Sequence, residues 1–203
     1  EWRGSVHAGA DNERFQKVWA EHGAKPACLP CHTTGHKPGT AKFAHAGVTC
    51  ESCHGAMAEG HPGGKMPLPV SSDMCAGCHK RSFQEWKVSR HGQKGIRCFD
   101  CHNVHKQGLR AGGGEALCGS CHPGRLKDFA HATHHVEGLT CASCHMPAFA
   151  TAADAVEGTG APGHSFTVGA EVCARCHEET VHKSAHLSDL RREVSAVQKD
   201  LVL

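Results

Sequence analysis

The chain has 203 residues, and its 22 Lys and Arg nearly balance its 20 Asp and Glu, so the net charge is +2 with the 20 histidines neutral. Because the basic residues form no run, a nucleic-acid-binding surface is excluded. Leu, Ile, Val and Phe make up only 32 of the 203 residues, which is close to the level of chains that cannot fold on an aliphatic core of their own.

A short helix is predicted near the N-terminus. Residues 12–21 (NERFQKVWAE) carry Phe15, Val18 and Trp19 at helical spacing, with Asp11 or Asn12 ahead of them as a cap. We expect this helix to lie over the group that the next motif binds.

All 14 cysteines fall in seven copies of one motif, Cys-x-x-Cys-His. The copies are CLPCH (28–32), CESCH (50–54), CAGCH (75–79), CFDCH (98–102), CGSCH (118–122), CASCH (141–145) and CARCH (173–177). In c-type haem attachment the two thiols add to the haem vinyl groups, and the adjacent histidine binds the iron as its proximal ligand. Zinc sites need no histidine after each CxxC pair, and disulfide frameworks leave irregular spacings. The motif therefore predicts seven c-type haems, the first covered by the helix at 12–21.

The residues that hold these haems follow directly from the motif. The covalent bonds are predicted at Cys28, Cys31, Cys50, Cys53, Cys75, Cys78, Cys98, Cys101, Cys118, Cys121, Cys141, Cys144, Cys173 and Cys176. The proximal iron ligands are predicted to be His32, His54, His79, His102, His122, His145 and His177.

The haem macrocycles supply the apolar surface that the chain lacks. Each is a broad apolar plate whose burial replaces missing side chains, and 24 Gly and 9 Pro allow sharp turns against it. We expect a haem-cored multihaem cytochrome c fold, mostly irregular with short α-helices, a helical turn at each motif and little or no β-sheet. With two ionised propionates on each haem, the loaded protein carries a charge of about −5 oxidised and about −12 reduced, so basic residues are interpreted as propionate partners.

An internal repeat of 43 residues organises the chain. Residues 75–102 align without a gap on residues 118–145, and residues 28–54 form a looser third copy. The repeat predicts one heptahaem domain over 1–186, built from two-haem modules at about 28–61, 75–105 and 118–164 and a seventh haem at 173–177.

Thirteen histidines remain after the seven proximal ones, and iron ligation from the opposite face is their obvious use. Two imidazoles keep a haem iron six-coordinate and low-spin, which suits one-electron transfer. Each module has one histidine before its second motif and one after it, and His7 or His182 completes the set. The candidate distal ligands are His7, His45, His61, His91, His105, His134, His164 and His182, with His22, His36, His131, His135 and His186 as second choices. The alternative for each is a surface or propionate-bonded histidine, and a distal histidine often serves the haem of another module.

The C-terminal segment differs from the rest of the chain. Residues 187–203 (LSDLRREVSAVQKDLVL) hold no haem motif, and Leu187, Leu190, Val194, Val197 and Leu201 follow heptad spacing. The pattern predicts an amphipathic helix that folds back on the chain's own haems or docks a coiled-coil partner or another copy.

Three segments carry a resemblance to known families. CHTTG (31–35), GVTCESCHG (47–55) and His61 resemble the superfamily of nitrifier tetrahaem cytochromes and octahaem hydroxylamine oxidoreductases. WKVSRHGQKGIRCFDCHNVH (86–105) resembles the repeating unit of pentahaem and decahaem periplasmic electron-transfer cytochromes, and GLTCASCHMP (138–147) is similar to both groups. The resemblance implies stacked and T-shaped haem pairs that form a wire, with two histidines on each iron.

Three functions remain open. The leading hypothesis is electron transfer between a respiratory donor and a redox protein partner or membrane complex, with no catalysis by this chain. A reductase or oxidase of a small nitrogen or sulfur compound needs an open haem face and acid–base groups, and the chain has no Tyr for the cross-link of hydroxylamine oxidoreductases and no CxxCK motif. The third hypothesis is a polymeric extracellular wire whose subunits meet haem to haem.

The attachment chemistry also predicts the location. Covalent haem attachment takes place outside the cytoplasm in bacteria and archaea, and the sequence shows no signal peptide or membrane span. We expect an exported, periplasmic or extracellular protein, associated with a membrane only through a partner or a missing anchor.

Overall fold

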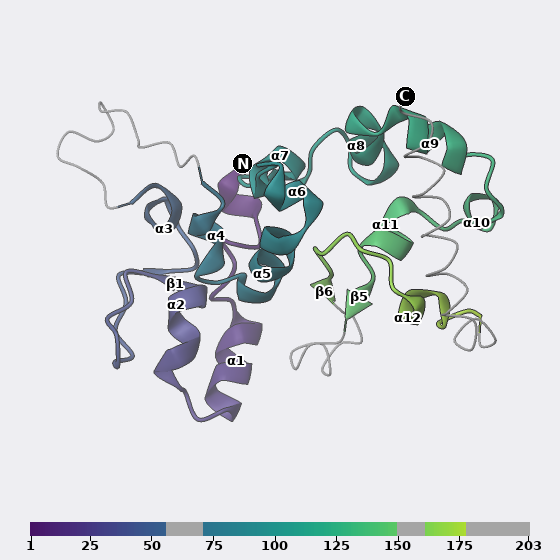
Figure 1. Ribbon diagram of the computed structural model, residues 1–203. Helices are drawn as coiled ribbons and strands as arrows, with labels where there is room; N and C mark the ends of the chain where they lie inside the picture. Colours follow the sequence, from purple (N-terminus) through teal and green to yellow (C-terminus); the bar gives the residue numbers. More distant parts are fainter. Residues whose placement is uncertain (56–70, 150–160, 178–203) are drawn as a thin grey trace. The chain divides into compact units, whose positions relative to one another are not determined.

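The computed structural model describes residues 1–55, 71–149 and 161–177, and Figure 1 shows their ribbon. The chain divides into two compact units, Glu1–Ala132 and Thr133–Leu203. The predicted C-terminal helix at 187–203 lies outside the described residues.

The first unit consists of short helices joined by turns. Its helices are η1 (Trp2–Gly4), α1 (Glu13–Glu21), η2 (Pro26–Cys28), α2 (Leu29–His32), α3 (Cys50–His54), α4 (Asp73–Ala76), α5 (Lys80–Val88), α6 (Arg90–Gln93), α7 (Cys98–Cys101), α8 (Gly114–Cys121) and α9 (Pro123–Phe129). Strand β1 (Thr33–Thr34) pairs antiparallel with β2 (His45–Ala46), and β3 (His102–Asn103) pairs with β4 (Gly108–Leu109).

The second unit has the same architecture of short helices and turns. Its described elements are α10 (Thr133–Val136), α11 (Cys141–His145), α12 (Ala170–Cys173) and the antiparallel pair β5 (Ala148–Phe149) and β6 (Ala161–Pro162). Every strand in the described part of the chain is two residues long, so the predicted fold class, short helices with little sheet, is confirmed.

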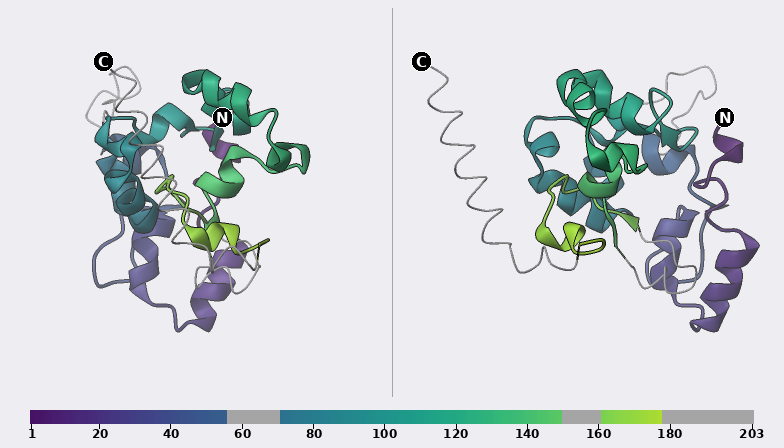
Figure 2. Two further views of the ribbon diagram at one scale, coloured as in Figure 1. Left: turned by 45° about the vertical axis from the view of Figure 1, so that its right-hand side comes forward. Right: turned by 90° about the vertical axis from the view of Figure 1, so that its right-hand side faces the viewer.

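The predicted N-terminal helix is present as α1. The side chain of Asn12 caps it by accepting a hydrogen bond from the amide of Phe15 at 2.9 Å. Figures 1 and 2 show α1 beside α2, which carries the first haem motif, and the ring of Phe15 stacks on that of His32 at a centroid distance of 3.8 Å. The apolar face of the helix is therefore turned toward the first motif, as the sequence predicts.

The 43-residue repeat is visible in the backbone. The amide of Ile96 donates to the carbonyl of His91 at 3.0 Å, and the amide of Leu139 donates to the carbonyl of His134 at the same distance. Gly95 and Gly138, which precede those amides, have φ angles of +75° and +81°, a conformation that favours glycine. The repeat therefore reproduces one local turn as well as one sequence pattern.

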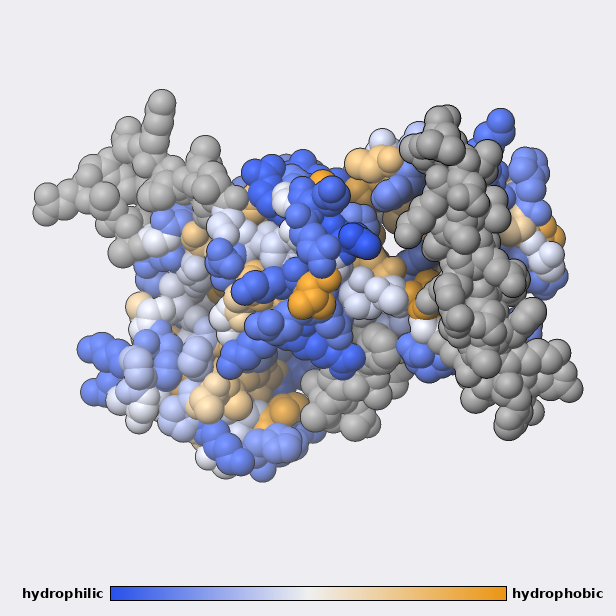
Figure 3. Space-filling model, in the orientation of Figure 1, coloured by the Kyte–Doolittle hydropathy of each residue, from blue (hydrophilic) through white to orange (hydrophobic). Residues whose placement is uncertain are grey.

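The polypeptide has almost no apolar core of its own. Among the described residues the buried hydrophobic side chains are Leu29, Phe83 and Val172, while Val6, Val88 and Val136 are 70–78% exposed. Figure 3 shows hydrophobic residues scattered among hydrophilic ones on the visible face. A domain of this size normally buries most of its aliphatic side chains, so another apolar body has to complete the core.

We predict that the chain without haem does not fold cooperatively. The three buried side chains cannot offset the conformational entropy of ordering the backbone. Far-UV circular dichroism of the full-length chain expressed without haem attachment should show weak helical signal and no sigmoidal urea transition, whereas the loaded protein shows both. A cooperative transition in the haem-free chain would contradict this view of the core.

Candidate haem-attachment sites

The seven motifs are numbered here as sites 1 to 7 in chain order. They are site 1 (Cys28, Cys31, His32), site 2 (Cys50, Cys53, His54), site 3 (Cys75, Cys78, His79), site 4 (Cys98, Cys101, His102), site 5 (Cys118, Cys121, His122), site 6 (Cys141, Cys144, His145) and site 7 (Cys173, Cys176, His177).

Each motif occupies about one turn of helix or tight turn. In sites 3, 5 and 7 the amide of the histidine donates to the carbonyl of the first cysteine at 2.9 Å, and in sites 2 and 6 the whole motif lies in α3 and α11. One helical turn brings side chains three and four residues apart to the same face. Both thiols and the imidazole therefore stand on one side of a short helix, ready to meet a flat ligand.

The side chains of the motifs fit a haem better than the alternatives. All fourteen thiols are free of disulfides, and each is exposed or only partly buried. The described part of the chain contains no group of three or more His, Cys, Asp or Glu arranged to hold a metal ion, whereas a structural zinc site requires four such ligands. A haem needs two thiols and an axial imidazole from one motif, and each motif provides them.

The spacer residues stabilise some of these turns. In site 4 the amide of Arg97 donates to Asp100 at 2.8 Å, and in site 6 the amide of Thr140 donates to Ser143 at 3.0 Å. Both acceptors occupy the second spacer position of the motif, so each caps the turn that it belongs to. The hydrogen bonds from Arg97 lower the pKa of Asp100, which keeps its carboxylate ionised as an acceptor.

Two proximal histidines are oriented by carbonyl groups. His32 Nδ1 lies 2.6 Å from the carbonyl oxygen of Ala10, and His145 Nδ1 lies 3.0 Å from that of Phe166. A ring that donates its Nδ1 proton to a carbonyl keeps the lone pair of Nε2 for a metal. These two imidazoles therefore fit the tautomer that binds iron.

Four proximal histidines each face a second histidine, and the space between the two rings is wide enough for one metal ion. The ring centroids are 5.9 Å apart for His79 and His7, 6.2 Å for His54 and His105, 5.9 Å for His122 and His91, and 6.0 Å for His177 and His134. A metal–nitrogen bond is about 2 Å long and each ring centre lies about another ångström beyond its nitrogen, so opposite ligands of one metal have centroids roughly 6 Å apart. All four separations match that spacing.

Three of these second histidines occupy the same structural position. Before each of sites 2, 4 and 6, the second histidine accepts a hydrogen bond at its carbonyl from the amide that lies two residues ahead of the first cysteine. The donors are Val48 to His7 at 2.9 Å, and Ile96 to His91 and Leu139 to His134 at 3.0 Å. In each case the imidazole faces the proximal histidine of the next odd-numbered site. The arrangement thus recurs before sites 2, 4 and 6.

His7 is held at this position from a distant part of the chain. Its amide donates to Gln107 Oε1 at 2.7 Å, and a Cβ on Gly47, whose φ is +74°, would meet the carbonyl oxygen of Ala8 at 2.4 Å. Burial, together with the nearby His79, lowers the pKa of His7. Its ring is therefore favoured in the neutral form, which is the form that binds metals.

The other candidate distal histidines lie in different surroundings. His45 is exposed in β2, His164 Nδ1 lies 3.0 Å from the carbonyl oxygen of Pro162, and His36 Nε2 lies 2.7 Å from that of Thr40. His22 follows α1 as its C-cap. His131 precedes α10 and His135 lies within it, whereas His61, His182 and His186 lie outside the described residues.

A buried threonine joins sites 1 and 2. Thr34 is 4% exposed, and its hydroxyl donates to the carbonyl of Gly47 at 2.9 Å and accepts from the amide of Thr49 at 2.8 Å. The hydroxyl of Ser52, a spacer residue of site 2, lies 2.8 Å away. Strand β1, which begins directly after His32, therefore holds the turn that carries site 2.

Comparison with known proteins agrees with this geometry. The family described as "Cytochrome c554 and c-prime" matches residues 2–55. The chain is also 26% identical over 123 residues to the multiheme cytochrome MtrA of Shewanella baltica (strain OS185), a match over 49% of this chain and 37% of that protein. The chain is a multihaem c-type cytochrome.

Three further findings concern the length, the fold and the helices of this cytochrome. It spans only about 37% of the length of the curated relative that it matches. No solved structure matches it. Among its described residues, no helix combines the length and the apolar character needed to cross a membrane.

We predict that Thr34→Val destabilises the loaded cytochrome. Valine has nearly the shape of threonine but leaves the amide of Thr49 and the hydroxyl of Ser52 without their buried partner, which costs about 1–3 kcal/mol. Denaturant unfolding followed by circular dichroism measures the change. Thr40→Val is the control, because Thr40 is exposed and water replaces its hydrogen bonds, so its effect stays within about 0.5 kcal/mol. Equal stabilities of the two variants would contradict the assignment of Thr34.

Proposed function

We propose that this cytochrome transfers electrons through seven covalently bound c-type haems, between a respiratory donor and a redox protein partner. The haem irons, once bound, supply the one-electron chemistry by changing between the ferric and ferrous states. The proposal is carried by the four pairs of facing histidines, whose ring centroids are 5.9–6.2 Å apart.

The facing histidines act by filling both axial positions. His7, His105, His91 and His134 are the proposed distal ligands of sites 3, 2, 5 and 7. Two imidazoles keep an iron low-spin in both oxidation states, so little rearranges when an electron arrives. They also leave no axial position for a small substrate, which favours a carrier over a catalyst at these four sites.

The whole sequence supports the same choice between carrier and enzyme. It contains no Tyr for the cross-link of hydroxylamine oxidoreductases, and no CxxCK motif for the lysine-ligated catalytic haem of nitrite-reductase relatives. The likeness to the multiheme cytochrome MtrA is in line with a partner that is itself a redox protein. We propose an exported protein, since attachment of c-type haem takes place outside the cytoplasm.

The haem count and the ligand pairs are tested together. Pyridine haemochrome analysis of the purified chain should give seven haems per polypeptide, and electron paramagnetic resonance (EPR) of the oxidised protein should show no high-spin signal from sites 2, 3, 5 and 7. Each of the substitutions His7→Ala, His105→Ala, His91→Ala and His134→Ala should convert one haem equivalent from low-spin to high-spin. The reason is that alanine leaves one axial position without its imidazole.

His36→Ala is the matched control for this series. His36 belongs to an exposed turn, where its ring meets the carbonyl of Thr40, and its loss should leave the low-spin signal unchanged. A high-spin haem in the unmodified protein at one of the four paired sites would contradict the proposal and favour an open, reactive iron. An unchanged spectrum for any of the four alanine variants would contradict that particular pair.

The angle between the two imidazole planes predicts a second spectroscopic feature. The planes of His54 and His105 are 8° apart, whereas those of His91 and His122 are 71° apart and those of His134 and His177 are 80° apart. Parallel planes split the iron d orbitals that overlap with the imidazole π systems, and perpendicular planes leave those orbitals nearly equal in energy. We expect an ordinary rhombic low-spin EPR signal from site 2 and highly anisotropic low-spin signals from sites 5 and 7. Loss of the rhombic signal in His105→Ala, with the anisotropic signals retained, confirms the assignment, and the reverse pattern contradicts it.

A further inference from the structure

We propose that site 3 is a junction in the first unit, adjacent to sites 1, 2 and 4, so that the electron route does not follow the order of the motifs along the chain. This inference rests on the proposed function and concerns the arrangement of the attachment sites. Contacts between the attachment turns support it, because each turn holds the two sulfurs that would tie one edge of a macrocycle to the protein.

Sites 3 and 4 are joined by one buried serine. Ser72 is 3% exposed, its carbonyl accepts a hydrogen bond from the amide of Cys75, and its hydroxyl accepts one from the amide of Cys98, both at 3.0 Å. The first cysteines of the two sites are therefore both anchored by their amides to one residue, and the first turns of sites 3 and 4 lie side by side.

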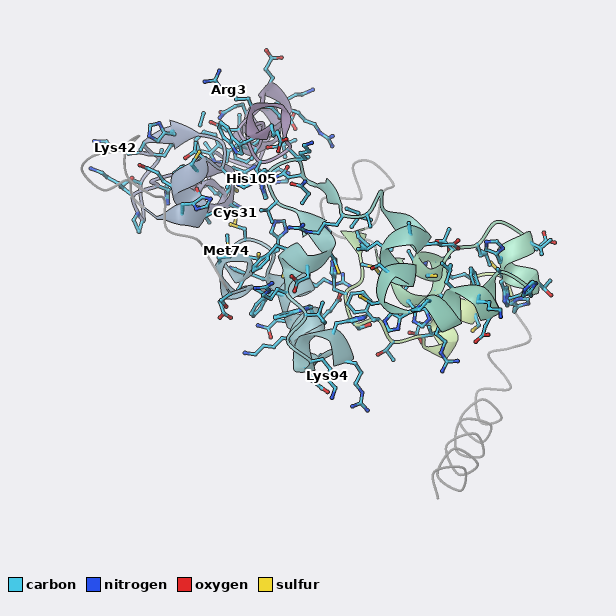
Figure 4. All side chains as sticks on the ribbon, turned by 90° about the horizontal axis from the view of Figure 1, so that it is seen from above. Arg3, Cys31, Lys42, Met74, Lys94 and His105 are labelled. Atoms are coloured by element: carbon cyan, nitrogen blue, oxygen red, sulfur yellow. The ribbon has the colours of Figure 1, made fainter. Side chains whose placement is uncertain are left out.

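Site 3 contacts site 1 through the sulfur of its second cysteine. Cys78 Sγ lies 3.9 Å from the carbonyl oxygen of Pro30, a spacer residue of site 1. Cys31 and Met74 are labelled in Figure 4, at the point where α2 approaches α4. The two sites are 47 residues apart in the sequence, from Cys31 to Cys78, yet an attachment sulfur of site 3 lies against the turn of site 1.

Site 2 adjoins site 3 through the histidine that faces it. The amide of Val48, two residues before site 2, donates to the carbonyl of His7 at 2.9 Å, and the ring of His7 faces His79 of site 3. The amide of His7 also donates to Gln107, which lies two residues beyond His105. Sites 2 and 3 are therefore neighbours through the segments that supply their opposite imidazoles.

The arrangement differs from a simple chain. Chain order gives site 3 two neighbours, sites 2 and 4, whereas the contact of Cys78 with Pro30 adds site 1. Within this unit, an electron at site 1 thus reaches site 4 through site 3 without visiting site 2.

The direct test is to locate the irons in a crystal of the full-length, haem-loaded protein by anomalous scattering at the iron edge. The iron of site 3 should have those of sites 1, 2 and 4 as its three nearest neighbours. The iron of site 1 should lie nearer to that of site 3 than to that of site 2. A map in which sites 1 to 5 follow each other in chain order overturns the proposal while leaving seven haems and their histidine pairs intact.

A variant tests the junction in solution. His7→Met keeps a ligand at site 3 but raises the reduction potential of that haem, because a thioether favours ferrous iron, so site 3 is reduced first. EPR at the potential where only this haem is reduced should show altered signals from three haem equivalents. His36→Met, which places a thioether in an exposed turn of the same unit where the proposal assigns no iron ligand, is the control and should leave these signals unaltered. Changes in only two haem equivalents in His7→Met overturn the junction.

Discussion

The whole fold depends on one helical turn that fixes two thiols and an imidazole on the same face. This turn is repeated seven times in 203 residues, and the polypeptide between the turns is too short and too polar to build a core. Leu29, Phe83 and Val172 are the buried apolar side chains of the described residues. The structure is consequently a set of attachment turns held at the right separations by buried hydroxyl groups, among them Thr34 and Ser72, with the apolar interior left to the ligand.

The second histidines explain how such a chain can become a single cooperative body. A motif and its opposite imidazole come from distant parts of the sequence: His7 faces site 3, and His105, which follows site 4, faces site 2. Under the proposed ligation, each iron closes a loop of several dozen residues, and loop closure of this kind restricts the unfolded chain in the way that a disulfide does. Metal ligation then contributes directly to folding, which compensates for the missing aliphatic contacts.

The parts of the fold that could be predicted from the sequence are those encoded locally. The attachment turns follow from the motif, α1 follows from Phe15, Val18 and Trp19 behind a capping Asn12, and the turn before site 4 recurs before site 6 because the sequence itself recurs. The histidine that takes this place before site 2 could not be predicted from the repeat. The repeat points to His45, but the carbonyl that Val48 contacts belongs to His7. Only the long-range packing of the N-terminal segment against Gly47 reveals that equivalence, and Gly47, in a glycine-rich chain, gives no sequence signal for it. His45 as a ligand and the helix at 187–203 stay predictions.

A short chain with many attachment sites favours a branched arrangement of those sites over a linear one. In a linear array each site touches two others, and the protein must span the full length of the array. Here the turns of sites 1 and 4 both reach site 3, through Pro30 and Ser72, so few residues connect many sites. The cost is that site 3 becomes sensitive to every neighbour, because a charge added at one site changes the potential of each site close to it. His7 is only half-buried, but its amide is held by Gln107 and its carbonyl by the amide of Val48. The second imidazole of site 3 is thus fixed from two distant parts of the chain, and this anchoring restricts how far that site's potential can vary when the N-terminal segment moves.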